Sequence, residues 1–163
     1  IFRMLKNFRI LALGLILTSC VAVGNVTLEV EDKIDAPKII AVNVTDGGPW
    51  MREIEVRLKK EGFKVLRAAG VNEAIEVDGQ KIIRYNEAST RYFLLVDAMA
   101  AVDWYHRCFG GGFNFDFINA DIIDLSSNET LASINSRGYS ENCPPMSGKI
   151  FTNITKMVVD SWK

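Results

Sequence analysis

Short hydrophobic runs separated by turn-forming residues fill most of the chain, a pattern typical of strands and short helices. Residues 38–44 are largely β-branched and apolar on both faces, which predicts an interior strand. Residues 50–61 place apolar side chains at helical spacing and end before a glycine, so they predict an amphipathic helix. Residues 63–67 return to a strand pattern. Together these three segments predict a βαβ unit with parallel strands.

The middle of the chain favours antiparallel structure. Residues 74–85 hold Asp78-Gly79 between two apolar pairs, which is a hairpin signal. Residues 91–96 predict another buried strand. For residues 98–107 the composition favours a short helix, but a wide loop fits equally well, and the sequence leaves both open.

Three phenylalanines, Phe113, Phe115 and Phe117, alternate as in a half-buried strand and are expected to belong to the core rather than to a ligand platform. The alternation changes phase near Ile118, which predicts a bulge or kink before residues 122–125. Residues 126–129 then predict a hairpin turn into one more strand.

The last segment predicts a helix capped by Ser147. Its apolar face consists of Ile150, Ile154, Met157, Val158 and Trp162. The whole pattern predicts a single α/β domain over residues 38–163, with a mixed sheet that a βαβ unit opens, a later antiparallel meander and one helix near each end. In element order this resembles the N-terminal domain of TolB and related envelope lipoproteins.

The N-terminal stretch has the layout of an export signal. Arg3, Lys6 and Arg9 precede an apolar run at residues 10–17, and small residues follow. The run of about eight apolar residues is much shorter than the ~20 that cross a bilayer as a helix. An uncleaved anchor and a soluble exported protein remain open alternatives.

The segment Leu17-Thr18-Ser19-Cys20 resembles the lipobox of bacterial lipoprotein precursors. The resemblance implies cleavage before Cys20, a diacylglycerol thioether on its sulfur and acylation of the new amine, for example by palmitate. Residues 1–19 would then be the signal peptide and residues 20–37 a lipidated tether. Val21 stands where the inner-membrane retention signal of such proteins has aspartate, which favours an outer-membrane anchor with the domain facing the periplasm.

Charge and composition narrow the partners further. Without Arg3, Lys6 and Arg9, the 20 acidic residues exceed the remaining basic ones by about four. The sequence has no basic stripe, so we expect no nucleic-acid partner, and an acidic body leaves membrane attachment to the lipid. A single histidine and the lack of a Cys-x-x-Cys motif predict neither a metal site nor a cofactor.

Cys108 and Cys143 remain once Cys20 carries lipid, and an even pair in an exported domain predicts a disulfide. Residues 138–151 and 108–112 around these cysteines resemble a family of bacterial envelope lipoproteins of unassigned function. That family supplies no site to transfer. The prolines after Cys143 predict a stiff loop that the disulfide holds to Cys108 and that leads the chain into the last helix. In a functional interpretation, which is compatible with the first, the loop presents Tyr139, Glu141 and Asn142 to a protein partner.

Three functions follow, of which the sequence favours the first. The chain would be a non-enzymatic binding or assembly component of the cell envelope. The alternative is an exported hydrolase in which His106, oriented by Asp103, activates Ser140 or Ser147, although no Gly-x-Ser-x-Gly elbow is present. A small-ligand carrier is the third, and it requires phenylalanines that face an apolar cavity. Enzymatic activity is therefore left open.

Replacement of the two kinds of cysteine should have different effects. Cys20→Ser should leave the protein without acyl groups and outside the membrane fraction. Cys108→Ser should loosen the fold, by about 3–4 kcal/mol for a loop of this length, and leave the protein membrane-bound. Mass spectrometry of the mature N-terminus and membrane fractionation check this. An acylated residue other than Cys20 would contradict it.

Overall fold

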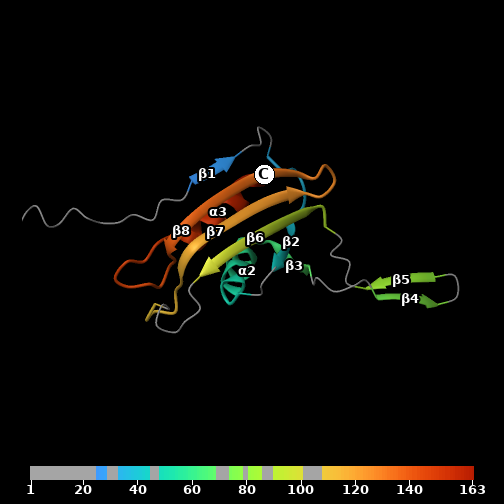
Figure 1. Cartoon of the computed structure of the whole chain (residues 1–163). Helices are drawn as coiled ribbons and strands as arrows, with labels where there is room; N and C mark the ends of the chain where they lie inside the picture. The colour runs from blue at the N-terminus through green and yellow to red at the C-terminus, as the bar shows by residue number, and fades with distance from the viewer. Residues whose placement is uncertain are drawn as a thin grey trace, which may run out of the picture.

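The structure is a computed structural model that describes residues 25–28, 33–44, 48–68, 74–78, 81–85, 90–100 and 108–163 (Figure 1). It confirms the predicted single α/β domain with a mixed sheet and one helix near each end. The main sheet has six strands in the order β1-β8-β7-β6-β2-β3. Cys20, Asp103 and His106 lie outside the described residues.

The βαβ unit consists of β2 (Ile39–Val44), α2 (Trp50–Lys60) and β3 (Lys64–Ala68). β2 runs parallel to β3 on one side and to β6 on the other, so it is the interior strand that its apolar sequence predicts. Gly62 adopts a φ of 86° and ends the helix in the left-handed conformation. Buried Glu55 ties α2 to β3 because its carboxylate accepts two hydrogen bonds from Arg67, at 2.8 and 3.0 Å.

The meander consists of β6 (Tyr92–Ala100), β7 (Asn114–Asp124) and β8 (Glu129–Tyr139), paired antiparallel. The pairing of β7 with β8 shifts between Phe115 and Ile118, which confirms the predicted irregularity. Buried positions change parity at the same place. Residues 98–100 continue β6, so the start of the undecided segment is neither helix nor loop, and residues 101–107 lie outside the described part.

Part of the segment expected to act as a tether belongs to the domain. β1 (Asn25–Leu28) pairs antiparallel with β8 and forms one edge of the sheet. Ile34 is buried, and its N–H donates to the carbonyl of Ser161 at 2.8 Å. The end of the expected tether therefore contributes to the core, because the apolar side chain of Ile34 packs against the C-terminal residues.

Helix α3 (Ile150–Ser161) packs beside α2 on the same face of the sheet. Every residue of its predicted apolar face is buried: Ile150, Ile154, Met157, Val158 and Trp162. The core between helices and sheet includes the fully buried Leu58, Leu94 and Ile122. The other sheet face carries half-buried side chains such as Phe93 and Phe117.

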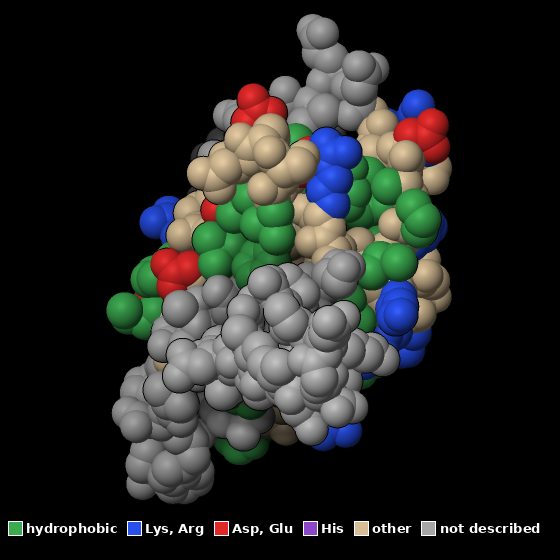
Figure 2. Space-filling model, turned by 90° about the vertical axis from the view of Figure 1, so that its right-hand side faces the viewer, with side chains coloured by type: hydrophobic (Ala, Val, Ile, Leu, Met, Phe, Trp, Pro, Cys, Tyr) green, Lys and Arg blue, Asp and Glu red, His purple; other side chains and the backbone are tan. Residues whose placement is uncertain are grey.

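The predicted hairpin forms a second, two-stranded sheet of β4 (Ala74–Asp78) and β5 (Lys81–Tyr85). Figure 2, which views the molecule from the right-hand side of Figure 1, shows basic and acidic side chains interspersed with hydrophobic ones. Within the described residues, no helix has the length and apolar character that crossing a membrane requires.

Asp124, at the end of β7, is buried and holds the β7–β8 turn in place. Its carboxylate accepts hydrogen bonds from Nε of Arg91, at 2.8 and 3.0 Å, and from the N–H and hydroxyl of Ser126, at 2.9 and 2.7 Å. The Arg91 guanidinium and these Ser126 bonds hold the pKa of the Asp124 carboxyl well below its usual range. Asp121 faces the opposite side of the sheet and accepts from Ser133 at 2.5 Å.

The depressed pKa of Asp124 makes its contribution to stability pH-dependent. The charged form is favoured in the folded state, so its contribution is present above the unfolded pKa of about 3.9 and is lost as the pH falls below it. Asp124→Asn should lower the free energy of unfolding by about 1–3 kcal/mol at pH 7. Urea denaturation should show this difference narrowing at pH 3. A difference that stays constant between the two pH values would contradict the assignment.

Candidate functional site

The most distinctive surface of the described residues is the seam between α2 and α3, which carries two open hollows of about 270 and 430 Å³. We call the residues that line the two hollows the helix seam. The smaller hollow lies near the helix N-termini and is lined by Arg52, Val56 and Asn142, among others. The larger one continues toward the C-terminal halves of both helices, past Lys60 and Lys156. Glu53 lines both, so the two hollows are neighbours on this surface.

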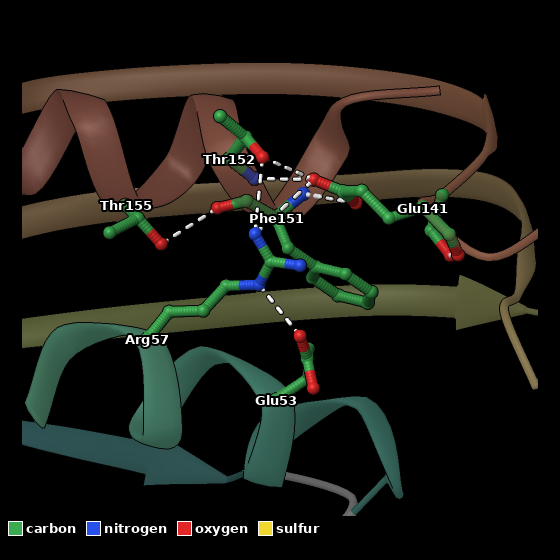
Figure 3. A network of polar contacts seen from close by, with 7 residues as sticks. Glu53, Arg57, Glu141, Phe151, Thr152 and Thr155 are labelled. Atoms are coloured by element: carbon green, nitrogen blue, oxygen red, sulfur yellow. Dashed lines mark hydrogen bonds and ion pairs between the residues drawn. The ribbon is translucent and has the colours of Figure 1, made fainter. Parts of the chain in front are cut away.

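Arg57 of α2 crosses the helix seam (Figure 3). Its Nε donates to Oε1 of Glu53 at 2.7 Å, and its Nη1 donates to Oγ1 of Thr152 on α3 at 3.1 Å. The same Nη1 lies 3.6 Å from Oε1 of Glu141, and the guanidinium carbon lies 5.9 Å from the centre of the Phe151 ring. One cation thus joins a helix pair to the loop before α3.

Glu141 occupies the N-terminus of α3. Its carboxylate accepts hydrogen bonds from the N–H of Phe151 at 3.1 Å, the N–H of Thr152 at 2.7 Å and the hydroxyl of Thr152 at 2.6 Å. These amides belong to the first helical turn, where backbone N–H groups have no acceptor within the helix. The negative charge of Glu141 also interacts favourably with the positive end of the helix dipole. Glu141 therefore caps α3, although the N-cap position itself is occupied by Lys149.

This arrangement corrects two expectations. Ser147 does not cap α3: the helix begins at Ile150, and the Ser147 hydroxyl instead accepts from the N–H of Cys143 at 2.9 Å. Glu141, expected to project from a binding loop, is turned onto the helix: both of its carboxylate oxygens bind α3, and its side chain is only 17% exposed. Of the predicted binding loop, Asn142 is exposed and Tyr139 is half-buried.

The predicted disulfide between Cys108 and Cys143 is present, with Cα atoms 4.8 Å apart. It joins the glycine-rich turn before β7 to the loop after β8, and the N–H of Gly112 donates to the carbonyl of Asn142 at 3.0 Å. A Cβ on Gly110 would lie 2.5 Å from that same oxygen, so the two backbones approach too closely for a side chain. Close packing therefore requires glycine at positions 110 and 112.

Of the four hydrolase candidates, the structure describes the two serines, while His106 and Asp103 lie outside the described residues. Ser140 is completely buried, and its Oγ accepts from the N–H of Phe113 at 2.9 Å and donates to the carbonyl of Glu141 at 3.0 Å. Ser147 is exposed and binds the Cys143 N–H. Ser140 thus fixes the loop that carries Glu141, and its hydroxyl faces the interior.

The phenylalanines separate into two groups. Phe113 and Phe115 pack edge-on against Trp50 with ring centres 5.8 and 5.6 Å apart, and both contact Phe151. Phe117 was expected in this core but lies half-buried on the other sheet face, opposite Met99, because the strand changes phase after Phe115. The buried rings pack against one another between the layers, and Phe113 and Phe151 also line the smaller hollow.

Sequence reasoning missed the helix seam and the cap by Glu141. One signal was available: Lys149 precedes α3, and a lysine side chain cannot accept hydrogen bonds from helix N–H groups. That deficit indicates an acceptor from elsewhere in the chain, although not which one. Among the described residues, no group of three His, Cys, Asp or Glu side chains lies close enough together to hold a metal ion.

No model of a protein family matches the chain, and no match is found among curated proteins. Two solved structures have a related arrangement. One is the PelC dodecamer from Paraburkholderia phytofirmans, with a TM-score of 0.45, 14% identity and coverage of 85% of this chain and 95% of that chain. The other is a single-substitution form of the same protein, with a TM-score of 0.43, 12% identity and coverage of 86% and 95%. Likenesses this remote say nothing about what the chain binds or how it assembles.

The cap can be tested through stability. Glu141→Ala should lower the free energy of unfolding by roughly 1–2 kcal/mol, because it removes the acceptor for two helix amides. Glu129→Ala, at an exposed position on β8, is the matched control and should change it by less than about 0.5 kcal/mol. Urea denaturation measures both. Equal effects of the two substitutions would rule out the cap.

Proposed function

We propose that this chain is a lipid-anchored protein of the bacterial outer membrane whose domain faces the periplasm and binds another envelope protein without catalysing a reaction. The sequence Leu17-Thr18-Ser19-Cys20 supports the anchor. The observation that carries the binding role is the helix seam, an open surface held in one conformation by Arg57 and Glu141.

The lining of the helix seam fits a protein surface better than an enclosed small ligand. The larger hollow is lined by charges of both signs, from Lys60, Glu61 and Lys156. Val56, which is 39% exposed to solvent, adds an apolar side chain to the lining of the smaller hollow. Protein interfaces combine apolar contacts with such a polar rim. A ligand carrier would instead need an enclosed apolar void, whereas the hollow that Phe113 and Phe151 line is open and is also lined by charged side chains such as Arg52 and Glu53.

Rigidity supports the same role. Arg57 is held by Glu53, Thr152 and Glu141, so its long side chain loses little further freedom when a partner covers it. Because ordering of side chains opposes association, a surface that is already fixed binds at a smaller entropic cost. The disulfide between Cys108 and Cys143 likewise fixes the loop that carries Glu141.

The anchor explains how an acidic domain stays at the membrane. A body with an excess of about four negative charges gains nothing from anionic lipid surfaces. Several acyl chains on Cys20 supply enough buried hydrocarbon for attachment that is effectively permanent, since each methylene contributes about 0.8 kcal/mol. The partner is then a protein that the anchored domain can reach at the same membrane.

Crosslinking in native membranes, with charge reversal on the helix seam, tests the binding role. The full-length tagged protein should yield a discrete crosslinked partner. Lys60→Glu combined with Lys156→Glu should reduce its recovery at least about tenfold, because both lysines line the larger hollow.

Lys64→Glu is the matched control, since this exposed lysine lies on edge strand β3. It should leave recovery unchanged. A wild-type protein that crosslinks to nothing, or a partner whose recovery is insensitive to the double substitution, would contradict the proposal.

A further inference from the structure

The loops joined by the disulfide expose several apolar residues, and we call these loops, residues 108–112 and 141–149, the stapled tip. Phe109, next to the disulfide, is fully exposed at 106%, and Met146 is 49% exposed. Pro144 and Pro145 between them are exposed as well. Exposed apolar residues that gather at one place mark a surface that contacts something other than water.

Of the polar residues that the sequence assigns to this loop, only the uncharged Asn142 is exposed. Glu141 is turned inward onto the N-terminus of α3, and Tyr139 is half-buried. Lys149 is exposed at the base of the tip. The exposed tip therefore combines apolar side chains at its end with a cation just behind them, an arrangement that suits the boundary between acyl chains and phosphate headgroups.

The direction of β1 brings the anchor to the same end of the domain. β1 is antiparallel to β8, with Asn25 opposite Asn135 and Leu28 opposite Ala132. Its first residue therefore lies nearest the end at which β8 leads to Tyr139 and the disulfide, on the left in Figure 1. Asn25, which follows the proposed anchor residue Cys20 by five positions, therefore lies toward that end of the sheet.

The reach of the chain matches the distance to be covered. From Asn135 to Tyr139, β8 advances by about 14 Å at the usual strand rise. The five residues from Cys20 to Asn25 span at most about 17 Å when extended. A membrane surface that holds acyl chains on Cys20 is thus kept within contact distance of the stapled tip.

The geometry points to the stapled tip as a membrane-contacting surface, with Phe109 and Met146 at the headgroup–acyl boundary of a phospholipid bilayer and Lys149 at the phosphates. This inference rests on the proposed anchor at Cys20. The bilayer is the occupant because the anchored chain enters the domain from this end. Residues of the tip line part of the smaller hollow of the helix seam. No tip residue lines the larger hollow, at Lys60 and Lys156, which stays accessible to a periplasmic partner.

Photo-crosslinking of the lipidated full chain tests the orientation. Phe109→p-benzoylphenylalanine is compared with Leu125→p-benzoylphenylalanine, because Leu125 is also exposed, at 51%, and lies in the β7–β8 turn at the opposite end of the sheet. Each variant is reconstituted in vesicles of phosphatidylethanolamine and phosphatidylglycerol and irradiated. Intact-protein mass spectrometry should find phospholipid adducts at least about tenfold more abundant at position 109 than at position 125.

The outcomes separate the orientation from the anchor. Acylated Cys20 with equal or no adducts at the two positions overturns the orientation and leaves the proposed anchor standing. Crosslinks from position 109 to a second copy of the chain or to another protein, without lipid adducts, overturn it as well. A mature chain without acyl groups on Cys20 overturns both.

Discussion

The contact between the Glu141 carboxylate and the first turn of α3 determines how the rest of the domain is arranged. Helix N-termini leave amide groups without acceptors, and here the residue before the helix is a lysine, which supplies none. Glu141 accepts from both Phe151 and Thr152 and places a negative charge at the positive end of the helix. Without it, α3 would begin with unpaired amides beside the aromatic core.

The position of Glu141 depends in turn on the loop that carries it. Buried Ser140 accepts from the Phe113 amide, and the disulfide holds Cys143 against the glycine turn before β7. Close approach of Gly110 to the Asn142 carbonyl completes this closure. Arg57 then links Glu141 to α2, so one chain of contacts runs from the disulfide to the helix seam. The apolar tip and the charged seam are consequences of the same closure, because turning Glu141 inward leaves hydrophobic residues outside.

Local sequence patterns predicted the elements whose signals lie within one segment. The βαβ unit, the β4–β5 hairpin and the apolar face of α3 follow from periodicity, and the phase change near Ile118 is visible in the alternation itself. The cysteine pair followed from number and context rather than geometry.

The features that sequence reasoning missed depend on residues far apart in the chain. Glu141 caps a helix from outside its own turn, so no capping pattern identifies it. Ile34 joins the core through its contact with the C-terminal residues, and Arg57 donates a hydrogen bond to Thr152, 95 residues later in the chain. Phe117 was misplaced because alternation gives the spacing of buried residues but not the residue at which the phase changes.

The most direct measurement of this account is amide hydrogen exchange at Thr152 in the wild-type protein, followed residue by residue by NMR. Thr152 is exposed, so burial of its side chain does not protect its amide. If the Glu141 carboxylate holds that N–H at 2.7 Å, exchange should be at least about tenfold slower than in an unstructured peptide of the same sequence. Exchange at the unstructured rate would contradict the central claim that Glu141 fixes the start of α3.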